Sequence, residues 1–525
     1  MCNPLGARSG SGRLFMSLAQ ALGRFVADLD LAQVPPPVVD KARTCLLNGY
    51  GIALGGHATP FAPVARRAGL ALDGERIGGA TLLGDGRKTS VDGAALANSA
   101  LFHGRAQEDT CGAGHFGTIM IPLLTALVEA RGLPVARLLP ALIAGYEVGG
   151  LLESAYGPKT TPAGLRASPL YGTLAAAAAS AHLLGLDAAR SAAALANAAS
   201  FTGGMLQSFA DGTDEWRYQV GVAARNGLVA TELARAGSRS APGAFEGRSG
   251  FVKAFARSDC DVPALLARLG QEWSVQRVTF KPFPVCAFNQ TPVTGALILR
   301  DKLEGRALKQ VRVRMNPFET GYAGMDARGP FDSISGTLMS IPFCIALTLL
   351  RGTPSMAAMT TYDDADVNAL TDRIELVTDD TVPVLSCVIE AETVDGARLV
   401  QDQRMTVADF AYDWDTDSKL VRRIGAETGV PAAASAAWRR PRAPRRCRPA
   451  PARGRTPPRG RRPPPARRSR RRCAAPAWRR CPSHRRNRPR SCADLAPPAR
   501  RRRPRPRSRR TAPAPCRRSP ARCGR

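Results

Sequence analysis

The segment TLAAAAASAHLLGLDAARSAAALANAASF, residues 173–201, decides the fold class of this 525-residue chain. Alanine occupies 14 of its 29 positions and is the residue with the highest intrinsic helix propensity. The pattern predicts two helices, the second of them N-capped by Asp187. Because side chains on every helix face are small, helices here can pack at short axial distances. The segment therefore predicts the interior of a buried helical bundle.

The flanking sequence extends this bundle. Residues 14–28 and 35–56 place apolar side chains at helical spacing, and the second range has Pro at its start and Gly at its end. Residues 80–93 contain Asp-Gly turn signals and predict a short hairpin. From residue 94 to about 237 the chain is alanine-rich and predicts helix after helix.

The pattern changes after about residue 272. The ranges 311–317, 373–380 and 386–407 are β-type, the last with a hairpin turn at Asp395-Gly396. Residues 333–352 predict one helix between them, and 418–429 return to helix. We therefore expect a mainly α protein with a large all-helical domain (13–271), a smaller α+β lid domain (272–406) and a return to the helical domain (407–430). The cleft between the two domains is the expected substrate site.

Residues 431–525 carry the chain's unusual charge. They contain 34 Arg, no Lys and one acid, whereas residues 1–430 are nearly neutral. With 20 of the 42 prolines and few apolar residues, this Arg/Pro-rich C-terminal tail is predicted to be disordered. It is either an arm that binds nucleic acid through phosphates or the product of a GC-rich gene translated out of frame. Nucleic acid is an expected partner only if the tail is genuine.

Compartment is predicted from the remaining cysteines and from the N-terminus. The seven cysteines before residue 431 form no CxxC pair, and their scatter favours a reduced chain. Residues 1–13 lack the hydrophobic centre of a signal sequence, and no uncharged apolar run reaches membrane-spanning length. We expect a cytoplasmic protein with no membrane partner.

The stretch HGRAQEDTCGAGHFG, residues 103–117, carries the chemistry. A metal site needs three or four converging ligands, and the twelve-residue separation of His103 and His115 matches no common metal pattern, so we expect no metal. The alternatives are a polar loop with hydrogen-bonded histidines and an acid/base site. In an acid/base site, Thr110 and the nearby glycine N–H groups would hold a carboxylate or enolate oxygen.

The region around this stretch resembles the signature of the MmgE/PrpD family, which includes 2-methylcitrate dehydratase, cis-aconitate decarboxylase and iminodisuccinate epimerase. The resemblance extends over residues 14 to about 430. It is carried by ALANSALFHGRAQEDTCGAGHFGTIMIPLLTALVEA (95–130), HLLGLD (182–187), DGTDEWRYQVGVAARNGL (211–228), FEGRSGF (245–251), KPFPVCAFNQ (281–290) and GPFDSISGTLMSIPFCIA (329–346).

The resemblance implies proton movement next to carboxylates without a cofactor. It also implies a homodimer and a substrate that is a small di- or tricarboxylate. In the family pattern His103 matches the first histidine, Asp109 and Thr110 the acidic-Thr pair, and His115 the histidine of an H-P-G motif. His115 is the strongest candidate base.

Other positions depart from the family pattern. Ala106 replaces an aspartate, Phe116 replaces the Pro of H-P-G, and Arg166 falls where relatives have a histidine. Residues 215–219, EWRYQ, replace a Thr-Lys-x-Leu-His motif of the family. The position of a later family histidine falls near Asn289 and Gln290 of this chain. Arginine is no general acid or base near neutral pH, but it holds a carboxylate bidentately.

Several side chains are accordingly predicted to bind substrate. They are Arg105, Arg166, Arg217, Lys281, Asn289 and Gln290. For each basic residue the alternative is a solvated helix face or a salt bridge, and Asn289 and Gln290 alternatively shape the loop after KPFP. Trp216 is predicted to be a pocket wall or core residue. Tyr322 is predicted to donate a proton from the lid, with a role in turn structure as the alternative.

The sequence thus predicts a lyase (hydro-lyase or decarboxylase-like) or an isomerase or epimerase that moves a proton α to a carboxylate. The reduced set of acid/base residues favours epimerisation over dehydration. The alternative is a non-catalytic carboxylate-binding or interaction protein on the same scaffold.

Overall fold

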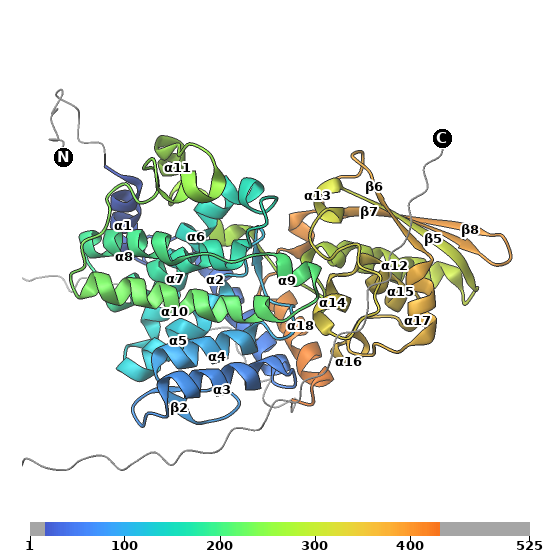
Figure 1. The fold of residues 1–525 in the computed structure, drawn as a ribbon, viewed down its shortest axis with the longest axis horizontal. Helices are drawn as coiled ribbons and strands as arrows, with labels where there is room; N and C mark the ends of the chain where they lie inside the picture. The colour runs from blue at the N-terminus through green and yellow to red at the C-terminus, as the bar shows by residue number, and fades with distance from the viewer. Residues whose placement is uncertain (1–15, 431–525) are drawn as a thin grey trace, which may run out of the picture. The chain divides into compact units, whose positions relative to one another are not determined.

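The computed structural model describes residues 16–430, and the predicted basic tail at 431–525 lies outside these residues. Two hydrophobic cores organise them, one in a helical domain and one in a lid. The mainly α architecture with a smaller α+β part is confirmed (Figure 1). The helical domain consists of α1 (Leu18–Asp28), α2 (Pro36–Gly56), α3 (Phe61–Asp73), α4 (Val91–Phe102), α5 (Gly117–Arg131), α6 (Leu138–Thr160), α7 (Ala167–Leu184), α8 (Ala188–Phe201), α9 (Gln207–Ala210), α10 (Glu215–Arg235) and α11 (Val262–Arg268).

Helix α7 lies at the centre of the bundle, as its alanine content predicts (Figure 1). Neighbouring helices approach it through glycines. A Cβ atom on Gly149 of α6 would lie 2.8 Å from the Cβ of Ala175, and one on Gly227 of α10 would lie 2.5 Å from the Cβ of Ala176. The Asp187 side chain accepts a hydrogen bond from the Arg190 backbone N–H and caps α8, as predicted. Small residues therefore set the interhelical spacing.

The predicted hairpin at 80–93 forms from β1 (Ala80–Thr81) and β2 (Lys88–Thr89). A second small sheet pairs β3 (Thr110–Cys111) with β4 (Val278–Thr279). Helix α6 with the turn before it, Val135–Thr160, is long and apolar enough to cross a membrane by length and composition. However, 72% of its most apolar window is buried inside the protein, as expected for a core helix.

The lid is a four-stranded sheet with helices packed against it. Strand order is β6 (Ile374–Thr378), β5 (Leu308–Met315), β7 (Ser386–Thr393) and β8 (Arg398–Arg404). Strands β5 and β6 are parallel, and the other two pairs are antiparallel. The predicted Asp395-Gly396 turn joins β7 and β8, with Gly396 at φ +88°. The lid helices are α12 (Gln290–Leu303), α13 (Pro317–Thr320), α14 (Ile334–Met339), α15 (Ile341–Arg351), α16 (Met356–Met359) and α17 (Ala365–Asp372).

One detail differs from the sequence predictions. Residues 333–352 form two helices, because the Ser340 side chain accepts a hydrogen bond from the Phe343 N–H and starts α15, with Pro342 in its first turn. Near the predicted boundary at residue 272, Val275, Val278 and Phe280 pack in the helical core, and Phe283 is the next residue along the chain that packs in the lid core.

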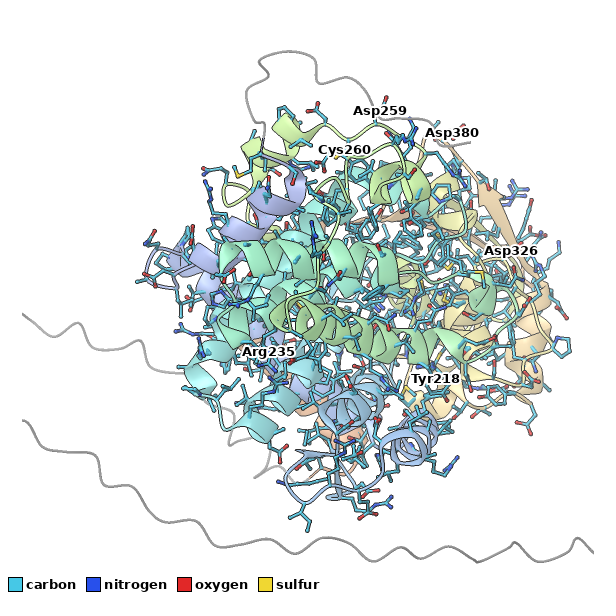
Figure 2. The ribbon with its side chains drawn as sticks, turned by 60° about the vertical axis from the view of Figure 1, so that its left-hand side comes forward. Tyr218, Arg235, Asp259, Cys260, Asp326 and Asp380 are labelled. Atoms are coloured by element: carbon cyan, nitrogen blue, oxygen red, sulfur yellow. The ribbon has the colours of Figure 1, made fainter. Side chains whose placement is uncertain are left out.

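After the lid, α18 (Trp414–Glu427) returns to the helical domain and packs on α2, as the sequence predicts. Figure 2 shows the same arrangement from another side, with Asp326 on the lid and Arg235 at the far end of α10.

Candidate functional site

The loop between α4 and α5, residues 103–116, is buried along most of its length and meets the lid. A cavity of about 60 Å³ lies where they meet. Its lining comes from the helical domain, from Lys281 in the segment that connects the helical domain to the lid (the crossing), and from the lid. The lining residues are Ala106, Glu108, Thr110, Gly112, Ala113, His115, Phe209, Trp216, Lys281, Cys286, Ala287, Phe288, Tyr322, Leu338 and Met339. The predicted interdomain site thus corresponds to a cavity in the structure.

His115 lines this cavity with its side chain 16% exposed. Its Nδ1 lies 2.9 Å from the Asp109 carbonyl oxygen. Because a carbonyl only accepts, Nδ1 carries the proton and Nε2 keeps its lone pair. Burial lowers the pKa of His115 well below its usual value, and the Lys281 cation lowers it further. The imidazole is therefore a neutral base near pH 7.

Glu108 is the carboxylate at the centre of the site, and no role for it was predicted from the sequence. Its Oε1 accepts a hydrogen bond from Lys281 Nζ at 2.9 Å and lies 3.5 Å from His115 Nδ1. Burial would raise the pKa of Glu108, but Lys281, His103 and His115 outweigh burial and hold it well below its usual value. Its position between two histidines and its lysine partner in KPFP are the signals that point to it.

His103 lies behind the cavity wall and is completely buried. Arg166 Nη2 lies 2.7 Å from its Nε2, and a guanidinium only donates, so Nδ1 carries the proton. That Nδ1 faces Glu108 Oε2 at 3.2 Å. Burial lowers the pKa of His103 to about 4. Arg166 occupies Nε2, and Nδ1 faces Glu108 without a hydrogen bond, so His103 lies behind the site and leaves the cavity to His115.

Arg166 and Arg217, both predicted to bind substrate carboxylates, pack around Trp216 and do not line the cavity. Arg217 Nη1 donates to the carbonyls of His103 and Gly104 at the end of α4, and its guanidinium lies 4.0 Å from the Trp216 ring. Arg166 donates to the Trp216 carbonyl and to Gln219. Burial lowers the pKa of Arg166 to about 10 and that of Arg217 to about 9. Both therefore remain cations beside the site.

Asp109 and Thr110 are adjacent in sequence but lie in different places. The Asp109 carboxylate is buried away from the cavity lining, where it accepts hydrogen bonds from Tyr146 at 2.6 Å and from the Gly117 N–H at the start of α5. Burial raises the pKa of Asp109 to about 6. Its backbone carbonyl, rather than its side chain, orients His115. Thr110 lines the cavity, and its hydroxyl is hydrogen bonded to that of Thr279.

Three other predicted substrate ligands are engaged in internal contacts. Arg105 pairs with Glu427 of α18 at 2.6 Å. Asn289 Nδ2 donates to the carbonyls of Leu338 and Met339. Gln290 bonds the backbone of Phe283 and Val285, which corresponds to the loop-shaping alternative. None of these three side chains lines the cavity.

Lid residues close the cavity with a mostly apolar surface. Tyr322 and Phe288 lie 5.2 Å apart by ring centroid, and Tyr322 also contacts Phe209 across the interface. Burial raises the pKa of Tyr322, so its hydroxyl stays protonated. Trp216 Nε1 donates to Ser335 of α14 at 3.1 Å and ties the lid to the helical domain.

Charge in the site favours an anion. Lys281, Arg166 and Arg217 surround it, whereas Glu108 is its one strongly ionised carboxylate within the described residues. Residues 16–430 contain no group of three or more His, Cys, Asp or Glu side chains that is arranged to hold a metal ion. A neutral imidazole base that lines the same cavity as the Lys281 cation can take a proton from a carbon next to a carboxylate.

Comparison with known proteins places the chain in a family. Residues 20–262 match the MmgE/PrpD N-terminal domain and residues 283–404 the MmgE/PrpD C-terminal domain. A cis-aconitate decarboxylase-like protein of Aspergillus oryzae is 30% identical over 276 residues, half of this chain and 57% of that relative. A cis-aconitate decarboxylase of Aspergillus terreus is 26% identical over 362 residues, 65% of this chain and 73% of that relative. These relatives support the prediction of a lyase acting on a carboxylic acid, and the chain belongs to the MmgE/PrpD family.

Proposed function

We propose that this protein is a lyase that moves a proton at the carbon next to a carboxylate of a small di- or tricarboxylic acid, without a cofactor. The observation that carries the proposal is His115. Its Nδ1 is fixed on the Asp109 carbonyl, and the ring lines the same cavity as Lys281. A base held in one tautomer beside a cation matches the needs of carbanion chemistry.

In the forward step, Nε2 takes the α-proton, and the electron pair of the C–H bond passes into the adjacent carboxylate as an enediolate. Lys281 Nζ stabilises the added negative charge. The enediolate electron pair then forms the C=C bond while the β-hydroxyl leaves as water, with the proton that Nε2 took in the first step. In a decarboxylation the C–CO2 bond breaks instead, its electron pair stays on carbon, and a His115 ring that was protonated before the step gives its Nε2 proton to that carbon as CO2 leaves. A bound polyanion raises the pKa of the imidazole, which allows this second role.

The relatives' names favour decarboxylation, whereas the altered family positions favour epimerisation over dehydration. All three reactions share proton transfer at the α-carbon. We also propose that the active form is a homodimer, as the family resemblance implies, and that it is cytoplasmic, as the scattered cysteines favour. The competing role, carboxylate binding without chemistry, differs in predicting no proton exchange.

The test is proton NMR of the purified full chain in D2O with a panel of small di- and tricarboxylates. We expect loss of one C–H signal, or a new alkene or decarboxylated product. His115→Asn should lower the exchange rate by a factor of about 10³, within the range of general base catalysis. Its thermal midpoint should stay close to that of the wild type, because His115 lies at the cavity surface.

His182→Asn is the matched control, because the His182 ring also contacts a backbone carbonyl, that of Val26, outside the site. It should exchange substrate at the wild-type rate. Equal rates in wild type and His115→Asn would refute the role of His115. A folded wild-type chain that leaves every acid unchanged would favour the binding role.

A further inference from the structure

A second cavity, of about 220 Å³, adjoins the one that contains His115. The two cavities share the lining residues Thr110, Gly112, Lys281, Ala287 and Phe288. A molecule bound at His115 can therefore extend into the second cavity past Lys281. The additional polar lining on that side comes mainly from the segment around β4.

Arg277, Thr279 and Lys281 follow one another at every second position of this segment, and all three line the second cavity. Val278, between the first two, is completely buried in the helical core. Within β4 successive side chains point to opposite faces, so Thr279 faces the cavity while Val278 is buried, and Arg277 reaches the same cavity from the end of the short 3-10 helix Ser274–Arg277. Cation, hydroxyl and cation thus line the cavity in order.

Arg277 is held in place but is only loosely neutralised. Its Nη2 donates to the Gly150 carbonyl at 2.6 Å. The carboxylate paired with it, Glu153, is 4.0 Å away. By contrast, Lys281 is 2.9 Å from Glu108. The Arg277 side chain is 33% exposed, so its remaining N–H donors can reach a ligand.

The composition of this lining selects for negative charge. The second cavity has two cations and the hydroxyls of Thr110 and Thr279, and its lining contains no Asp or Glu; the Gln290 amide, which also lines it, is already hydrogen bonded to the backbone. A separate groove of about 590 Å³, which shares Tyr322 with the His115 cavity, is lined by uncharged residues alone. The remote carboxylate of a bound polyacid therefore has one favourable direction, toward Arg277.

We propose that Arg277, with Thr279, forms a second carboxylate subsite that binds the substrate carboxylate remote from the reacting carbon. This inference rests on the proposed function for the placement of the reacting carbon at His115. It assigns Arg277 as a specificity-determining residue that selects acids with an additional carboxylate. Guanidinium groups suit this task because their N–H donors match both oxygens of a carboxylate.

The test is calorimetric binding of two unreactive acids, tricarballylate with three carboxylates and succinate with two, to the full chain. We expect Arg277→Gln to raise the Kd of tricarballylate tenfold or more and that of succinate no more than twofold. Arg277→Lys should recover most of the tricarballylate affinity, because it keeps the charge. Arg312→Gln, which changes an arginine paired with Glu375 on the outer part of the lid, is the control and should change neither Kd.

The ratio of the two Kd values separates a subsite from a structural role, since loss of the Gly150 contact would weaken both acids alike. If Arg277→Gln does not fold, the same binding measurement is made with Thr279→Val. This variant should raise the Kd of tricarballylate by about threefold and leave the Kd of succinate unchanged. An unchanged ratio, or a wild-type chain that does not bind tricarballylate, would overturn the subsite. Binding requires no turnover, so failure of the NMR exchange experiment would count against the proposed function alone.

Discussion

The two sides of the candidate cavity differ in chemistry. The helical wall, which we define as Glu108, Thr110 and His115 with Lys281 at the crossing, consists of ionisable and hydroxyl groups fixed by internal hydrogen bonds. The lid wall, Cys286, Phe288, Tyr322, Leu338 and Met339, is apolar apart from a thiol and a hydroxyl. One side holds the reacting groups in place and the other excludes water from them, which strengthens electrostatic interactions at the site.

Of the substitutions in the two walls, removal of Lys281 should have the largest effect on stability and turnover. Lys281→Met leaves the buried Glu108 without its cation, and breaking a buried ion pair costs about 3–5 kcal/mol of unfolding free energy. Turnover should fall by about 10², measured by the NMR exchange rate. Glu108→Gln combined with Lys281→Met should restore stability, measured by chemical denaturation, but not turnover. Full activity in the double variant would contradict the role of Lys281.

The same variant changes the pH profile in a defined direction. A base works in its unprotonated form, so kcat/KM rises with pH through the pKa of His115 in the free enzyme. Burial and Lys281 hold that pKa well below its usual value, so wild-type activity should be level around pH 7. Without Lys281 the pKa rises, and the acidic limb should move to higher pH.

Tyr322 is the hydroxyl on the lid wall, and its substitution sharpens the comparison. If it supplies a proton, as the sequence predicts, Tyr322→Phe should lower turnover about tenfold and leave unfolding free energy unchanged. Tyr362→Phe, a lid tyrosine outside the cavity lining, is the control. An effect below twofold in Tyr322→Phe would assign the whole lid wall to water exclusion.

The smallest effect is expected at the contact that joins the walls. Trp216→Phe removes the hydrogen bond from Nε1 to Ser335, worth about 1 kcal/mol of unfolding free energy. KM should rise two- to threefold because the lid is held less firmly. A double-mutant cycle with Ser335→Ala, read by chemical denaturation, should show coupling; additive effects would mean that the contact does not hold the lid.

Sequence patterns predicted the helices well because their signals are local. The alanine run around α7, the Asp187 cap and the Asp395-Gly396 turn each depend on neighbouring residues. The split at Ser340 was missed because the apolar pattern continues on both sides of it and hides the helix-start signal of Ser340 and Pro342.

Side-chain partners at the site were less predictable, because they come from distant segments. Lys281 meets Glu108 across 173 positions, and Arg105 meets Glu427 across 322. Sequence could place a histidine and a lysine near the cleft. It could not show that the Asp109 carbonyl would orient His115, or that Arg166 would occupy His103.

Helix α18 has a consequence for the order in which the protein is made. It fills a surface of the first domain, where Asp417 accepts a hydrogen bond from Asn48 at 2.8 Å and Glu427 pairs with Arg105 beside the loop of the site. During translation, α2 is synthesised more than 350 residues before this partner. The surface of α2 that α18 covers therefore stays exposed in the nascent chain while the lid is synthesised. Chaperones that bind nascent chains can contact this surface throughout that period.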